Sequence, residues 1–278
     1  MTNQQDRDTL GPAKSGITIA NYSHVFQLTH GDDIRLIEVL RDVSLDVSTG
    51  QFVSIVGPSG CGKTTLLNVL AGLEKAQTGE VHLDDAAPRA GRPDIAYMFA
   101  RPALLPWRTV LDNAAFGMEV REIARADRYA KAHDLLKRVN LAGFEHAYPS
   151  QLSQGMRQRV ALARTFALDC KYLLMDEPFG ALDAQTKLQL EQQLLELYDA
   201  SPHSTIVFVT HDLGEAIVLS DRVAVMTDRP GTISVDIPIS LERPRSVSAL
   251  QASTAYHELY RELWGALAQR PLDKIVEE

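Results

Sequence analysis

The sequence predicts an α/β fold that is built on a largely parallel sheet. Two runs of almost only apolar residues, 172–175 and 205–210, are typical of strands that are covered on both faces. A third apolar strand, 52–56, leads through a glycine-rich loop into an apolar helix over 63–73. The 278 residues suffice for one large domain, or for one domain with a subdomain.

The segments outside this pattern have a different character. Residues 1–16 are polar and predicted to be a disordered leader, and short strands are predicted over 17–20, 34–39 and 43–47. Between residues 109 and 168, apolar residues recur at three- and four-residue spacing, which predicts a separate helical layer. Further strands are predicted over 78–83 and 222–226, with a helix over 188–197.

Composition limits the possible functions. The chain has 28 Lys and Arg against 36 Asp and Glu, a net charge of −8, which argues against nucleic acid or anionic lipid as a general partner and leaves room only for a local basic patch. Cys61 and Cys170 lie far apart and form no metal-ligand pattern, so a reducing cytoplasm is expected. No apolar run approaches the roughly 20 residues that span a bilayer, and the N-terminus lacks the apolar core of a signal peptide. A membrane role would therefore need a second chain.

Residues 57–65, GPSGCGKTT, match the phosphate-binding pattern G-x-x-x-x-G-K-[ST]. The glycines allow a tight turn whose N–H groups point at a polyphosphate. Lys63 is expected to place its ammonium on the outer phosphates, and Thr64 to hold Mg²⁺. A glycine-rich turn that merely carries a lysine is the alternative, but the strand before it and the helix after it disfavour that interpretation. The motif predicts binding of a nucleoside triphosphate.

The strand over 172–175 ends in two carboxylates. Beside a phosphate loop, Asp176 is expected to hold Mg²⁺, and Glu177 to lie over the γ-phosphate as the base that polarises water. Alone, the pair would be an ordinary polar strand end. His211 directly follows the strand over 205–210, where a side chain would face the nucleotide, although a lone histidine is more often structural.

Two further helical features stand out. Ser153 is a good N-cap for a helix over 157–168, and Gly155 permits close approach of an anion to that N-terminus, although an ordinary capped helix has the same appearance. Residues 246–278 are predicted to form one amphipathic helix, which we expect to pack on its own domain rather than on a membrane or a partner. Its apolar residues recur at helical spacing: Tyr256, Leu259, Tyr260, Leu263, Trp264 and Leu267.

In combination, these motifs resemble the ATP-binding subunit of ABC transporters from about residue 17 to about 239. The stretch 152–156 is similar to the LSGGQ signature, with Gln154 and Met156 substituted, and residues 180–183 to the D-loop, which ends at Asp183. The resemblance implies that Ser153, Gln154 and Gly155 contact the ATP of a second copy, and that His211 is the switch histidine. Phe26 falls where the family stacks an aromatic on adenine, with Tyr22 as the nearby alternative. The implied nucleotide-binding loop comprises Gly57, Pro58, Ser59, Gly60, Cys61, Gly62, Lys63, Thr64 and Thr65.

The resemblance also implies an architecture. It consists of a RecA-like P-loop NTPase core with an antiparallel β subdomain and an inserted α-helical subdomain over about 100–168, all within an ATPase domain over 17–245. The implied activity is ATP hydrolysis with Mg²⁺.

Three stretches, 104–110, 177–183 and 228–231, are similar to the nitrate/sulfonate/taurine importer branch. That branch implies a transmembrane permease, an extracytoplasmic solute-binding protein, and a peripheral place on the cytoplasmic face of the inner membrane. A small anionic solute is implied, but its identity cannot be read from a subunit that never touches it.

One departure from the family pattern concerns catalysis. The family carries a glutamine directly after Phe99, where it reaches the metal and the attacking water, but this chain has Ala100, followed by Arg101. A regulatory cassette of low activity therefore remains an alternative. A soluble ABC ATPase that acts on DNA or ribosomes is another, although the paired cassettes, coiled-coil insertions and basic surfaces of such proteins are not visible.

Overall fold

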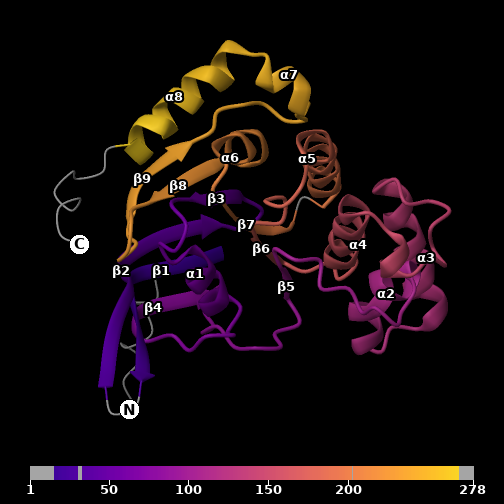
Figure 1. Cartoon of the computed structure of the whole chain (residues 1–278), viewed down its shortest axis with the longest axis horizontal. Helices are drawn as coiled ribbons and strands as arrows, with labels where there is room; N and C mark the ends of the chain where they lie inside the picture. The colour runs from indigo at the N-terminus through magenta and orange to yellow at the C-terminus, as the bar shows by residue number, and fades with distance from the viewer. Residues whose placement is uncertain (1–15, 31–32, 202, 269–278) are drawn as a thin grey trace, which may run out of the picture.

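The computed structural model describes residues 16–30, 33–201 and 203–268 (Figure 1). The predicted leader therefore lies outside the described residues, except for Gly16, which begins the first strand.

A six-stranded sheet forms the centre of the molecule, with strand order β5-β6-β7-β3-β8-β9. All neighbouring strands are parallel except β9, which runs antiparallel to β8. Every residue of β3 and β7 is buried, which explains their apolar sequences. The strands are β3 (Phe52–Val56), β5 (Ile95–Met98), β6 (Tyr172–Asp176), β7 (Thr205–Thr210), β8 (Arg222–Met226) and β9 (Ile233–Pro238).

A second sheet of three antiparallel strands has the order β2-β1-β4. The strands predicted over 34–39 and 43–47 are parts of one long strand, β2 (Asp33–Ser48), which pairs with β1 (Gly16–His30). Strand β4 (Thr78–Leu83) completes the sheet as predicted. Helix α1 (Lys63–Leu70) shares one apolar core with both sheets, so the phosphate loop that precedes it is held between them.

The helical layer expected between residues 109 and 168 is present on one side of the central sheet (Figure 1). Thr109 caps α2 (Val110–Val120) by accepting a hydrogen bond from Asp112 N, and Ser153 caps α4 (Gln154–Phe166) in the same way from Met156 N. With α3 (Arg125–Arg138), these helices bury an apolar core that continues to the central sheet.

The C-terminal helices lie along the top of the molecule in Figure 1, above α6 (Leu213–Leu219) and β8, whereas the helical layer lies at the right. Within the described residues, the segment predicted as one helix forms two, α7 (Val247–Gln251) and α8 (Thr254–Ala268). The side chain of Ser253 accepts a hydrogen bond from Tyr256 N and starts the second helix anew. Leu263 is fully buried in a cluster with residues of α6, β8 and β9, which confirms that the helix packs on its own domain. Residues 269–278 of the prediction lie outside the described part.

No helix among the described residues is long and apolar enough to cross a bilayer.

Candidate active site

The loop between β3 and α1 forms the floor of a cavity of about 340 Å³. The backbone at Gly62 has a φ of +107°, and a Cβ there would lie 2.5 Å from Leu40 Cδ2, so the turn requires glycine. The cavity is lined by Phe26, Val39, Ser59, Gly60, Gly62, Lys63, Thr64, Thr65, Glu177 and Arg229. Of the predicted loop residues, Gly57, Pro58 and Cys61 do not line it: Gly57 and Cys61 are buried, and Pro58 is partly exposed.

Lys63 brings a cation to this cavity. Its Nζ is 2.8 Å from both Gly57 O and Pro58 O, and 3.8 Å from Glu177 Oε1. The side chain is nearly fully buried, so its charge acts where water screens it little. The Lys63 ammonium therefore supplies a positive charge at the cavity, where it can bind a phosphate.

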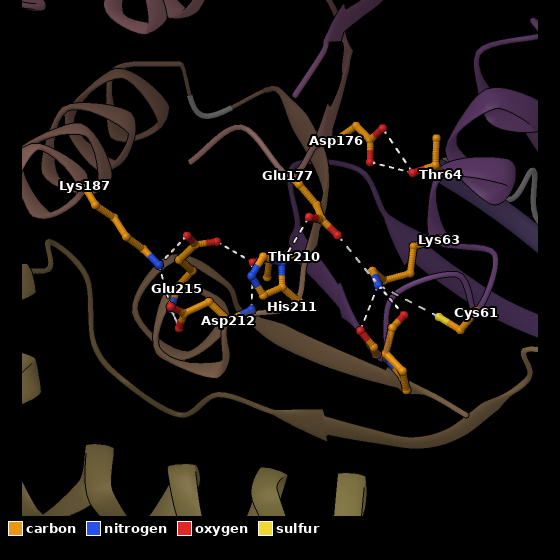
Figure 2. Close-up of polar contacts among 12 residues, drawn as sticks. Cys61, Lys63, Thr64, Asp176, Glu177, Lys187, Thr210, His211, Asp212 and Glu215 are labelled. Atoms are coloured by element: carbon orange, nitrogen blue, oxygen red, sulfur yellow. Dashed lines mark hydrogen bonds and ion pairs between the residues drawn. The ribbon is translucent and has the colours of Figure 1, made fainter. Parts of the chain in front are cut away.

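Thr64 and Asp176 bring hard oxygen atoms together beside the loop. Thr64 Oγ1 donates to Asp176 Oδ1 at 2.9 Å and lies 3.1 Å from Oδ2 (Figure 2). Burial raises the pKa of the Asp176 carboxyl, a cost that a bound cation would offset. A hydroxyl and a carboxylate are ligands that Mg²⁺ prefers, so this pair fits the ion.

Glu177 and His211 meet because they follow neighbouring parallel strands, β6 and β7. His211 Nδ1 lies 3.0 Å from Glu177 Oε2, and Glu177 also faces Lys63 (Figure 2). Glu177 has a φ of +42°, an unfavourable backbone conformation for a residue with a Cβ. Its N–H donates to Val209 O at 2.9 Å, which helps to hold that conformation. Thr64, Lys63, Asp176, Glu177 and His211 form what we call the phosphate cluster.

Phe26 also lines the cavity. The alternative, Tyr22, is fully buried, and its hydroxyl is 2.7 Å from His24 Nδ1. The His24 ring packs edge-on against Phe26, with 4.7 Å between the ring centroids. Phe26, and not Tyr22, is thus available to a ligand.

Sequence reasoning missed two lining residues, Val39 and Arg229. Arg229 belongs to the turn between β8 and β9, which touches the phosphate loop: a Cβ at Gly231 would lie 2.1 Å from Cys61 O. The stretch 228–231 had been noted only as a family likeness. Its proximity to the loop follows from β8 pairing with β3, which the sequence does not reveal.

The residues of the signature and D-loop lie elsewhere. Ser153 caps α4, and Asp183 caps α5 (Ala184–Asp199) by accepting from Thr186 N at 3.0 Å. A Cβ at Gly155 would lie 2.4 Å from Thr186 Cγ2, so this glycine serves close packing of α4 on α5. Neither Ser153, Gln154, Gly155 nor Asp183 lines the cavity of their own chain. We call these four residues the signature cluster.

Ala100 and Arg101 are exposed and do not line the cavity. No ion pair of Arg101 is found within the described part of the chain. Neither residue therefore replaces the family glutamine in this conformation.

Comparison with known proteins agrees with this geometry. The family model "ABC transporter" matches residues 40–180. An ABC transporter ATP-binding protein of Methanocaldococcus jannaschii is 44% identical over 238 residues, covering 86% of this chain and 87% of that protein. An aliphatic sulfonates import ATP-binding protein of Xanthomonas axonopodis pv. citri is 45% identical over 218 residues, covering 78% and 86%.

Solved structures extend the comparison to the fold. A dimeric bacterial ABC transporter cassette superposes with a TM-score of 0.71 at 31% identity, covering 81% of this chain and 100% of that one. A second structure of the same cassette, described as a post-hydrolysis state bound to ADP and Pi, gives a TM-score of 0.70 at 29% identity with the same coverage. The chain belongs to the ABC transporter family. It has the P-loop NTPase fold and is an ATPase that uses ATP and Mg²⁺.

Proposed function

We propose that this chain is the ATP-hydrolysing subunit of an importer that takes up a small anionic solute of the nitrate, sulfonate or taurine type. The likeness to the sulfonate import protein, over 86% of that protein's length, carries this proposal. The chain acts at the cytoplasmic face of the inner membrane, bound to a separate transmembrane permease. An extracytoplasmic solute-binding protein delivers the solute, and nucleic acid takes no part.

The phosphate cluster performs the chemistry. Lys63 and the backbone N–H groups of the loop over 57–65, in which only Pro58 has none, bind the outer phosphates of ATP, while Phe26 stacks on adenine. Glu177 accepts the proton of the attacking water, and His211, 3.0 Å from it, orients its carboxylate. Thr64 and Asp176 hold Mg²⁺, which neutralises charge on the phosphates when bound. Most of the rate comes from this fixed electrostatic arrangement.

The signature cluster completes the site of a second copy. Ser153 does not line the cavity of its own chain, and the similar cassette of known structure is dimeric. In a head-to-tail dimer, each ATP lies between the phosphate cluster of one copy and the signature cluster of the other. Closure of the two copies on ATP drives the permease, and hydrolysis resets it. On this proposal, residues 17–245 form the ATPase domain, with the helical subdomain over about 100–168.

The experiment begins with a search for a permease and a solute-binding protein that are encoded beside this chain. Binding of nitrate, taurine and short alkanesulfonates to the solute-binding protein identifies the solute. The three proteins are then reconstituted in vesicles, and ATP-dependent uptake is measured with wild-type chain and with Glu177→Gln. The proposal expects uptake of an anion only with wild type. If the solute-binding protein binds a neutral sugar or a cation instead, the proposed solute class is wrong. If the ATPase activity is the same with and without the permease, the proposed transport function is wrong.

A further inference from the structure

A partly buried ionic network lies next to His211, and Lys187 is its cation. Lys187 belongs to the first turn of α5, four residues after Asp183 of the signature cluster. Its Nζ is 2.5 Å from Asp212 Oδ2 and 2.6 Å from Glu215 Oε1 (Figure 2). One ammonium thus joins the start of α5 to the start of α6.

The two carboxylates fix the chain on both sides of His211. Asp212 Oδ1 accepts hydrogen bonds from Gly214 N and Glu215 N, and Asp212 N donates to Thr210 Oγ1 at 3.0 Å. The Thr210 hydroxyl donates in turn to Glu215 Oε2. The residues before and after His211 are therefore held by side chains that Lys187 connects. In Figure 2 the dashed lines join Lys187, Asp212, Glu215 and Thr210, and a second set runs from His211 through Glu177 to Lys63.

The charges of this network depend on the lysine. Glu215 and Glu191 are each only 2% exposed, and burial raises the pKa of both carboxyls. Lys187 is the cation that opposes this effect on Glu191, Glu215 and Asp212 alike. Without it, acidic groups would remain buried without compensation, which favours protonation or rearrangement.

Stability alone is a weak explanation for such a group. Buried ion pairs seldom stabilise a protein more than apolar side chains of similar size would. This one lies between helix α5, which follows the D-loop, and the histidine that contacts the proposed base. It joins Lys187 to Asp212, which is 25 residues further along the sequence. These ion pairs therefore link α5 to the segment of the active site that carries His211.

We propose that Lys187 is a positioning residue for ATP hydrolysis, which ties the D-loop helix α5 to Thr210 and Asp212 and so holds His211 against Glu177. If α5 moves when two copies close, Lys187 would transmit this movement to His211 and thus to the base, Glu177. The inference rests on the proposed roles of His211 and Glu177.

The test measures single-turnover ATP hydrolysis and ATP affinity of the full chain at saturating protein. Lys187→Met, which keeps length but loses charge, is expected to lower the hydrolysis rate about tenfold, the size of a modest misplacement of a catalytic group. ATP affinity should stay within about twofold, because Lys187 does not line the cavity. Lys187→Arg should retain most of the rate. Lys137→Met, an exposed lysine of α3, is the matched control and should change nothing.

A double-mutant cycle separates positioning from general stability. In a His211→Ala background, Lys187→Met should cause no further loss of rate, since the lysine acts through that histidine. If Lys187→Met leaves the rate unchanged, or lowers it by the same factor in both backgrounds, the inference is wrong. If His211→Ala itself leaves the rate unchanged, the proposed role of His211 fails, and this inference fails with it. Should Lys187→Met not fold, Glu215→Gln takes its place in the cycle, with the same expected pattern.

Discussion

The phosphate cluster and the signature cluster are built in opposite ways. The first is assembled inside one chain, where the C-terminal ends of β3, β6 and β7 bring Lys63, Asp176, Glu177 and His211 into contact. The second lies at the N-termini of α4 and α5, where Ser153 and Asp183 are exposed and each caps its own helix. On the proposed function, one chain therefore carries the groups that bind phosphate, whereas its signature cluster serves the phosphate of another copy.

The largest effect is expected within the phosphate cluster. Glu177→Gln removes the base but keeps its shape, so ATP binding should persist while turnover falls by roughly 10²–10⁴. Steady-state ATPase activity and a nucleotide-binding assay on the same preparation check both parts. Unchanged turnover would mean that Glu177 is not the base.

A smaller effect is expected at Phe26, on which adenine is proposed to stack. Phe26→Ala removes the stacking surface and should weaken ATP affinity about tenfold, within the usual range for loss of an aromatic–base contact. Phe26→Tyr should retain affinity. Measurement of ATP affinity for both variants decides the matter, and equal affinity of Phe26→Ala and wild type would contradict the stacking role.

The loop after β5 tests whether the phosphate cluster is complete. Strand β5 pairs with β6, so Ala100 follows the sheet at the edge where β6 ends in Asp176. Ala100→Gln supplies the missing polar group and should raise ATPase turnover by roughly two- to tenfold. A flat or reduced rate would show that the site has adapted to alanine.

The smallest expected effect concerns stability near the signature cluster. Burial, helped by the charge of Glu215, raises the pKa of the Glu191 carboxyl from 4.5 to about 8. Between these values the folded chain holds a proton that the unfolded chain releases, so the free energy of unfolding falls as pH rises through that window. Glu191→Gln should remove this decline and raise Tm at pH 8 by a few degrees relative to wild type. If Tm of wild type and of Glu191→Gln depends on pH in the same way, Glu191 is not the group that causes this decline.

Much of the phosphate cluster could be predicted because its motifs are local. Residues 57–65 and the carboxylates after 172–175 combine an apolar strand with polar residues at its end, and the parallel sheet then brings such ends together. Arg229 could not be predicted, since its proximity to the loop depends on the pairing of β8 with β3. The sequence did not reveal that Gly155 also lies against Thr186, and the approach of an anion to this glycine stays a prediction.

The fold shows the same limit. The buried strands were predicted from their continuous apolar sequences, whereas β5 and β9 were missed. Strand β5 has only four residues, and β9 is the antiparallel edge strand, which is partly exposed and alternates in burial. Ser253 divides the predicted C-terminal helix because its hydroxyl caps α8. Such a side-chain hydrogen bond to the backbone competes with a continuous helix, and the spacing of apolar residues does not reveal it.

The most direct test of the account is a mixing experiment with two inactive chains. Lys63→Ala disables the phosphate cluster, and Ser153→Arg disables the signature cluster, with Tm of each variant confirming that it folds. In a mixed dimer, one site combines the intact phosphate cluster of the second variant with the intact signature cluster of the first. Random pairing of equal amounts should therefore restore about a quarter of wild-type ATPase activity, because half of the dimers are mixed and each has one intact site of two. No recovery on mixing, or full activity of Ser153→Arg alone, would contradict a site shared between two copies.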